Sequence, residues 1–169
     1  MKNIVLTGYM ASGKSTIGAE LAKTTGLKFI DTDAMVVNAE GISISEIFSK
    51  FGEEYFRDCE TKACREAARE NGAVIATGGG AVLRSENIDA LRENGVVFNL
   101  EPSAALIRER LEEAREGRPL MEGAEIEAVL ERFYNRKPFY DNCDCKIFVS
   151  NSKSPREHAA EILERMRTK

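Results

Sequence analysis

The chain has 169 residues, of which 43% are hydrophobic and 31% are charged, as in an ordinary globular protein. This length predicts one domain with a self-sufficient core. The formal charge of −4 argues against bulk electrostatic binding to nucleic acid or to anionic lipid. The sequence has no apolar run of membrane-spanning length, no signal-peptide core and no heptad seam. With four cysteines interpreted as reduced thiols, it predicts a cytoplasmic monomer.

Short apolar runs alternate with longer helical stretches along the chain. Strands are expected at residues 3–7, 28–31, 73–77, 96–100 and 146–150. Helices are expected at residues 14–24, 45–71, 85–93, 103–115, 125–134 and 155–166. Continuous apolar strands that alternate with helices are typical of a parallel sheet covered on both faces. The sequence therefore predicts a doubly wound α/β fold, a three-layer sandwich.

The first strand leads into a phosphate-binding pattern. Residues Gly8–Ser15 read GYMASGKS and match G-x-x-x-x-G-K-[ST] between a strand and a helix. Backbone N–H groups and the helix N-terminus can bind phosphate there. Lys14 is expected to reach the β- and γ-phosphates, and the Ser15 hydroxyl to ligate Mg²⁺. The alternative, a glycine-rich turn with a solvated lysine, does not explain this position in the chain.

Two further loops follow predicted strands. The second strand ends in Asp31-Thr32-Asp33, and the third continues into Thr77-Gly78-Gly79-Gly80. Open α/β sheets bind their ligands at the carboxyl ends of the strands. One carboxylate could hold a metal-bound water while the other meets an acceptor hydroxyl, and the glycines would let a ligand approach the main chain. The alternatives are helix-capping aspartates and a flexible glycine loop.

Three arginines and one polar segment complete the candidate residues. Residues 109–123 read ERLEEAREGRPLMEG, and a polar loop of this length is typical of a lid. Arg118 lies in this segment, whereas Arg57 and Arg136 lie near other helical stretches. A guanidinium offers a rigid fork for carboxylates and phosphates, although a single arginine is more often part of a surface ion pair.

Together these motifs resemble the shikimate kinase family over nearly the whole chain. The segments that carry the resemblance are GYMASGKST (Gly8–Thr16), FIDTD (Phe29–Asp33), GEEYFRDCE (Gly52–Glu60), VIATGGG (Val74–Gly80), RPL (Arg118–Leu120) and RKPFY (Arg136–Tyr140). The resemblance implies a P-loop fold like that of nucleoside monophosphate kinases, with a five-stranded parallel sheet. It further implies a single domain over residues 1–169, a substrate-binding subdomain near 32–60 and a lid near 109–123.

The same resemblance implies a reaction, transfer of the ATP γ-phosphoryl group to the 3-hydroxyl of shikimate. It also implies the nucleotide-side roles. The residues expected to bind the ATP phosphates are Ala11, Ser12, Gly13, Lys14, Ser15 and Thr16. Ser15 and Asp31 would hold Mg²⁺, while Arg110 and Lys153 would lie on the adenine side.

On the acceptor side, the resemblance makes Asp33 the candidate base, in contact with the shikimate hydroxyls. Arg57 and Arg136 would grip the carboxylate. Gly79 and Gly80 would line the ring. Lys14 and Arg118 would complete the catalytic set with Asp33, Arg118 closing over the transferred phosphate.

Two other functions remain open at this stage. A kinase for another small hydroxy acid, such as gluconate, would use the same two-arginine grip. An ATP-binding regulatory domain without turnover would need only the P-loop. Nucleic acid and membranes are not expected partners of any of these.

Overall fold

A single parallel sheet forms the centre of the protein. The computed structural model describes residues 1–116 and 123–168. The five strands are β1 (Asn3–Thr7), β2 (Lys28–Asp31), β3 (Ala73–Ala76), β4 (Gly95–Pro102) and β5 (Cys145–Val149). Their order across the sheet is β2-β3-β1-β4-β5, and every neighbouring pair is parallel. The predicted α/β fold with a five-stranded parallel sheet is confirmed.

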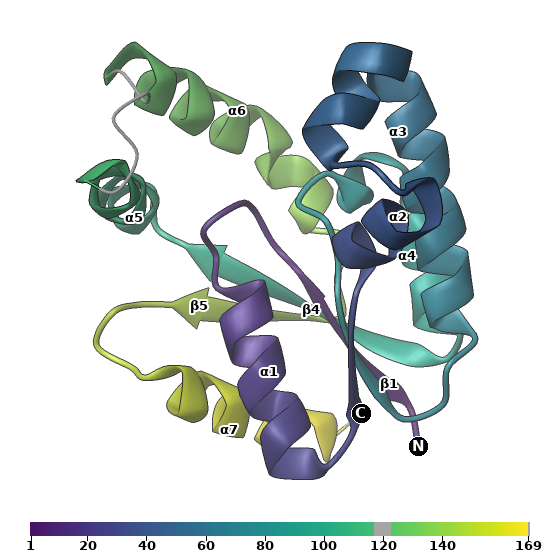
Figure 1. The fold of residues 1–169 in the computed structure, drawn as a ribbon. Coiled ribbons are helices and arrows are strands. Elements are labelled where there is room, and N and C mark those ends of the chain that lie inside the picture. Colours follow the sequence, from purple (N-terminus) through teal and green to yellow (C-terminus); the bar gives the residue numbers. More distant parts are fainter. Residues whose placement is uncertain (117–122, 169) are drawn as a thin grey trace.

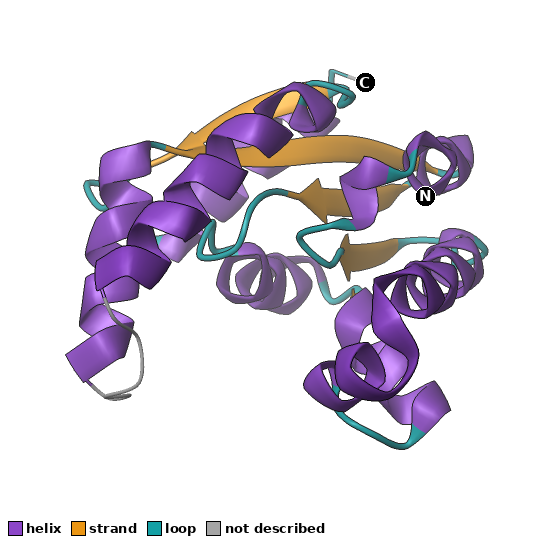
Figure 2. Ribbon diagram, turned by 90° about the horizontal axis from the view of Figure 1, so that it is seen from above, coloured by secondary structure: helices purple, strands orange, loops and turns teal. Residues whose placement is uncertain are grey.

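Helices lie on both sides of this sheet (Figures 1 and 2). They are α1 (Lys14–Thr25), α2 (Thr32–Glu40), α3 (Ile44–Ala68), α4 (Ser85–Glu93), α5 (Ala104–Glu116), α6 (Gly123–Tyr140) and α7 (Pro155–Met166), with a 3₁₀ turn at Ala81–Leu83. The P-loop lies between the α5–α6 pair and the α2–α3 pair, beyond the ends of the strands (Figure 1). No helix in the described part of the chain has the length and apolar character that crossing a membrane would require.

The two faces of the sheet belong to different apolar clusters. Ile4 and Leu6 of β1 pack with residues of α1 and α7, whereas Val5 packs with α4, α5 and α6 on the other face. Successive side chains of a strand point to opposite faces, so a strand that is covered on both faces must be apolar throughout. This is the physical reason for the continuous apolar runs in the sequence.

The substrate-binding subdomain differs from the sequence prediction. Residues 32–40 form α2, which was not expected, and the Asp31 carboxylate begins it by accepting hydrogen bonds from the backbone N–H groups of Asp33 (2.9 Å) and Ala34 (3.2 Å). The capping alternative is therefore correct for Asp31. Gly52, with φ 83° and ψ 176°, divides α3 into two helical parts. This backbone conformation favours glycine.

The lid region and the end of α6 also differ. The expected helix over residues 103–115 is confirmed as α5 (Ala104–Glu116), so the overlapping expectation of a polar loop is wrong for residues 109–116. Residues 117–122 lie outside the described part of the chain. Helix α6 continues past the expected end at Tyr134 to Tyr140, although Pro138 lacks the N–H for a helical hydrogen bond. Burial of the Tyr140 ring supports this last turn through tertiary packing.

Candidate active site

The P-loop connects β1 to α1 through a backbone that glycine makes possible. Gly8 has φ 149°, and a Cβ there would lie 2.7 Å from the Leu100 carbonyl oxygen. Gly13 has φ 93° and begins α1. Ala11, with φ 60°, is the one non-glycine residue with positive φ among those described. The loop therefore presents its backbone at the N-terminus of α1, where N–H groups favour an anion.

Lys14 is held inside this loop. Its ammonium group donates to the carbonyl oxygens of Gly8 (2.7 Å) and Tyr9 (3.0 Å). Burial lowers the pKa of Lys14 to about 8, against the opposing charges of Asp33 and Asp31. The Ser12 hydroxyl lies 3.4 Å from the ammonium as a third, weaker acceptor. A poorly solvated ammonium with only neutral partners is a strong attractor for phosphate oxygens.

Oxygen ligands suited to a hard cation lie beside the loop. The Ser15 hydroxyl is 3.5 Å from Oδ2 of Asp31, while Oδ1 of Asp31 caps α2. Capping fixes the carboxylate and leaves one oxygen facing Ser15. A hydroxyl and a carboxylate oxygen at the start of α1 fit Mg²⁺, which favours oxygen ligands together with substrate phosphates.

A cavity of about 580 Å³ opens beside the P-loop, next to α5 and the segment that joins β5 to α7. Its lining residues come from the P-loop, α1, α5, the end of β5, the segment before α7 and the start of α7: Ala11, Gly13, Thr16, Ile17, Arg110, Val149, Asn151, Lys153, Ser154, Pro155 and His158. The Arg110 guanidinium donates to the Ala11 carbonyl and to the Asn151 side chain. Lys153 pairs with Glu161 at 2.9 Å. The structure thus brings Arg110 and Lys153 to one cavity beside the phosphate loop.

Arg57 of α3 is a largely buried cation that lies next to Gly80. Its side chain is 9% exposed, and it forms ion pairs with Glu60 (2.7 Å) and Glu53 (3.1 Å). The guanidinium also lies 5.2 Å from the centre of the Phe56 ring. A Cβ at Gly80 would come within 3.0 Å of this guanidinium, so only glycine lets Arg57 pack against the loop. Arg57 is therefore fixed before any ligand arrives.

Two carboxylates meet at Gly78. Oδ1 of Asp33 and Oε1 of Glu60 are buried and have no hydrogen-bond partner among the described residues. A Cβ at Gly78 would come within 3.0 Å of both oxygens. The Gly78 N–H donates to the Thr32 hydroxyl at 3.0 Å, which fixes the loop against α2. Buried polar atoms normally have partners, so these two acceptors suit a ligand that brings hydroxyl donors.

The electrostatics of these two groups differ from those of exposed carboxylates. Burial and the nearby Asp31 charge raise the pKa of Asp33, while Lys14 and Arg57 oppose the rise. Burial also raises the pKa of Glu60, opposed by Arg57. A carboxylate with a raised pKa is a better proton acceptor than an ordinary aspartate.

Helix α6 brings Arg136 to the same region. The Arg136 charge acts on Glu60, opposing the rise that burial causes in its pKa, and it acts in the same sense on Tyr9 of the P-loop. Arg118, the expected lid arginine, lies outside the described residues. Lys14, Asp33, Arg57 and Arg136 therefore act on one region at the carboxyl edge of the sheet.

Sequence reasoning missed two residues of this region, Glu60 and Gly78. Glu60 lies three residues after Arg57 in α3, a spacing that places both side chains on one helix face. That spacing could have identified Glu60 as the partner of Arg57. Nothing in the sequence shows that Gly78 contacts two carboxylates, because the three segments meet only in the folded chain.

Comparisons with known proteins identify the family of this chain. The family model described as shikimate kinase matches residues 10–167. A shikimate kinase of Caldanaerobacter subterraneus subsp. tengcongensis is 44% identical over 164 residues, which cover 96% of this chain and 95% of the relative.

Two solved structures are similar over the whole fold. The shikimate kinase of Acinetobacter baumannii in complex with shikimate has a TM-score of 0.87 and 32% identity, covering 99% of this chain and 94% of that one. The shikimate kinase of Aquifex aeolicus has a TM-score of 0.81 and 32% identity, covering 98% of this chain and 96% of that one. By sequence, fold and the arrangement of its site, this chain belongs to the shikimate kinase family.

Proposed function

We propose that this chain transfers the γ-phosphoryl group of ATP to the 3-hydroxyl of shikimate, giving shikimate 3-phosphate and ADP. The observation that carries the proposal is the burial of two groups, the Arg57 guanidinium and the unpartnered carboxylate oxygen of Asp33. A buried, pre-oriented guanidinium suits a small carboxylate, and a buried carboxylate with an unpartnered oxygen suits a hydroxyl donor. Asp33 lies near enough to the P-loop lysine for its charge to oppose the fall in the pKa of Lys14.

In this proposal, the protein acts mainly by positioning and charge. Asp33 would accept a hydrogen bond from the attacking hydroxyl and take its proton as the bond to phosphorus forms. Lys14 would exchange its carbonyl partners for phosphate oxygens, and Arg118 would approach the transferred group from the lid. Arg57 and Arg136 would hold the carboxylate, with Gly79 and Gly80 against the ring.

The nucleotide would lie across the P-loop. Residues 11–16 would bind its phosphates, and the cavity lined by Arg110 and Lys153 would take the adenine. We assign Mg²⁺ to Ser15 and Asp31, whose oxygens lie next to each other at the start of α1. The metal would neutralise phosphate charge during transfer.

The two alternatives have less support. The gluconate kinase alternative lacks a matching motif beyond the P-loop, whereas the shikimate kinase model matches nearly the whole chain. A regulatory domain would not need the buried Asp33–Arg57 arrangement. We further propose a cytoplasmic monomer, in keeping with four free cysteines.

The direct test measures ADP release with Mg-ATP and a titration of shikimate, with gluconate in parallel. We expect turnover that depends on shikimate and not on gluconate. Asp33→Asn should lower kcat by about 10²- to 10⁴-fold, as expected when a general base is lost. Asp58→Asn is the matched control, since Asp58 lies on α3 and forms a surface ion pair with Arg84, the residue before α4. Absence of shikimate-dependent ADP release from the wild-type chain would refute the proposal.

A further inference from the structure

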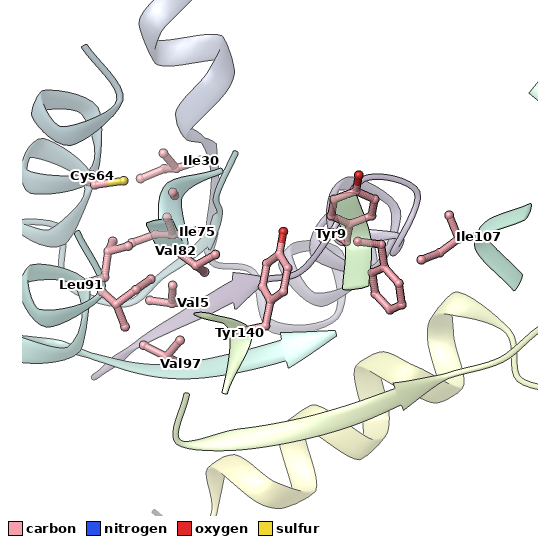
Figure 3. Packing of buried hydrophobic residues seen from close by; sticks show 14 of the residues in the cluster. Val5, Tyr9, Ile30, Cys64, Ile75, Val82, Leu91, Val97, Ile107 and Tyr140 are labelled. Carbon is pink, nitrogen blue, oxygen red and sulfur yellow. The ribbon is translucent and has the colours of Figure 1, made fainter. Parts of the chain in front are cut away.

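Two tyrosines connect α6 to both ligand loops. Tyr9 in the P-loop donates its hydroxyl to the Val129 carbonyl in the middle of α6 at 2.8 Å. Tyr140 at the end of α6 donates its hydroxyl to the Gly79 carbonyl in the glycine loop at 2.5 Å. The rings lie edge to face, with centroids 6.4 Å apart. Figure 3 shows both rings among the residues of the apolar cluster that packs on the sheet.

The hydrogen bond from Tyr140 contacts a peptide unit between two glycines. The peptide unit that it contacts joins Gly79 to Gly80, and a unit between two glycines can rotate at low cost because neither residue has a Cβ. A Cβ at Gly79 would make only ordinary van der Waals contact with the P-loop backbone, 3.6 Å from the Met10 nitrogen, so steric crowding does not fix the orientation of this unit at Gly79.

A trans peptide unit is planar, with its carbonyl and N–H on opposite sides. All peptide bonds described here are trans. Fixing the Gly79 carbonyl toward Tyr140 therefore turns the Gly80 N–H to the opposite side. Gly80 is also the residue against which Arg57 packs, so the orientation of this unit affects the surface that faces the acceptor.

Tyr140 is suited to this task. Its side chain is 4% exposed and packs in the main apolar cluster, so its hydroxyl has little freedom to move. Burial raises the pKa of Tyr140 well above its ordinary value, and the hydroxyl remains a donor. Tyr140 also follows Arg136 by four residues, a spacing that places both side chains on one helix face.

We propose that Tyr140 is a positioning residue for the acceptor substrate: its hydroxyl fixes the Gly79–Gly80 peptide unit in the orientation that binds shikimate. Tyr140 does not touch the reacting atoms. It acts through the backbone, and it ties the glycine loop to the helix that carries Arg136. This inference rests on the proposed function, since it names the loop that the acceptor would contact.

The test removes only the hydroxyl. In Tyr140→Phe the buried ring remains, so a role in filling space is preserved while the hydrogen bond is lost. We expect the KM for shikimate to rise roughly two- to tenfold, the range for one net hydrogen bond. The KM for ATP should stay within about twofold, since the P-loop keeps its own bond through Tyr9. Tyr134→Phe is the matched control on the same helix, because Tyr134 is 59% exposed.

A second measurement does not require turnover. Amide hydrogen exchange in a peptide covering residues 77–83 should be faster in Tyr140→Phe than in the wild type, with no change in peptides covering β1 or α7. Unchanged exchange and an unchanged KM for shikimate would overturn the inference, as would equal changes in both KM values. The wild-type chain could prove inactive toward shikimate while Tyr140→Phe still speeds amide exchange in residues 77–83. That result would refute the proposed function and would support the anchoring of the loop by Tyr140.

Discussion

The nucleotide side and the acceptor side of the site are built in different ways. The phosphate-binding part of the nucleotide side is one continuous segment, residues 8–16, and it offers backbone groups and a lysine whose ammonium donates to two carbonyls. The acceptor side combines side chains from α2, α3 and α6 with the glycine loop, and its charges are buried before any ligand binds.

This difference has a physical cause and a consequence. Phosphates can be bound by backbone N–H groups, which every sequence supplies, so a short glycine pattern is enough. A carboxylate and specific hydroxyls must be distinguished from similar groups, and this requires buried side chains with fixed partners. Substitutions on the two sides should therefore affect the two substrates separately.

The largest expected effect comes from the nucleotide side. Lys14→Met removes the cation that would move from loop carbonyls to phosphate oxygens, so kcat/KM for ATP should fall about 10²- to 10³-fold. Lys23→Met, an exposed position in the last turn of the same helix, is the control and should keep wild-type rates. Steady-state kinetics with ATP as the varied substrate decide the matter. A loss below tenfold would contradict the role given to Lys14.

The corresponding change on the acceptor side is Arg57→Ala. It removes the proposed carboxylate partner and leaves Glu60 buried without its ion pair, so the KM for shikimate should rise roughly 30- to 1000-fold. The Kd for ATP, from titration calorimetry, should change by less than about threefold. Arg65→Ala is the control, since Arg65 is an exposed residue of α3. Equal losses for the two substrates would remove the distinction between the two sides.

Two neighbouring glycines test how closely the acceptor side is packed. Gly78→Ala would push a methyl group into Asp33 and Glu60, and a displacement of the base of about 1 Å can cost on the order of 10²-fold in kcat. Gly79→Ala places its methyl group no closer than 3.6 Å to a neighbour and should cost several-fold less. Comparing kcat for the two variants, with melting temperatures to confirm folding, checks the prediction. The reverse order would show that the Asp33–Gly78–Glu60 contact is unimportant.

A pH dependence from Lys14 is also expected, and it is small within one pH unit of the pKa. Because burial lowers the pKa of Lys14 to about 8, the free enzyme loses this charge as the pH rises through that value. The value of kcat/KM for ATP, which reports the free enzyme, should then fall by up to about tenfold per pH unit. A constant value from pH 7 to 10 would contradict the pKa assigned to Lys14.

The free energy of unfolding should also depend on the charge of Lys14, but it should rise over the pH range in which kcat/KM for ATP falls. Between about pH 8 and the ordinary lysine pKa of 10.5, the unfolded chain binds the proton that the folded chain has lost. The contribution of Lys14 to the free energy of unfolding should therefore rise with pH in this window. Urea denaturation of the wild type and Lys14→Met at both ends of the window isolates that contribution.

The sequence by itself determined the sheet, most of the helices and the P-loop. These depend on local patterns: the continuous apolar runs of strands covered on both faces, the spacing of apolar residues along the helices, and the glycines of one loop. The sequence also indicated that Asp31 could cap a helix, although α2 itself was not expected.

Only the tertiary structure decided how the acceptor side is assembled. Gly78, Asp33 and Glu60 come from three separate segments, and no local pattern shows that they meet. The last turn of α6 is a second case, because burial of Tyr140 outweighs the cost of Pro138. The reason is the same in both cases: burial and contact between distant segments depend on the packing of the whole chain, which local propensity does not contain.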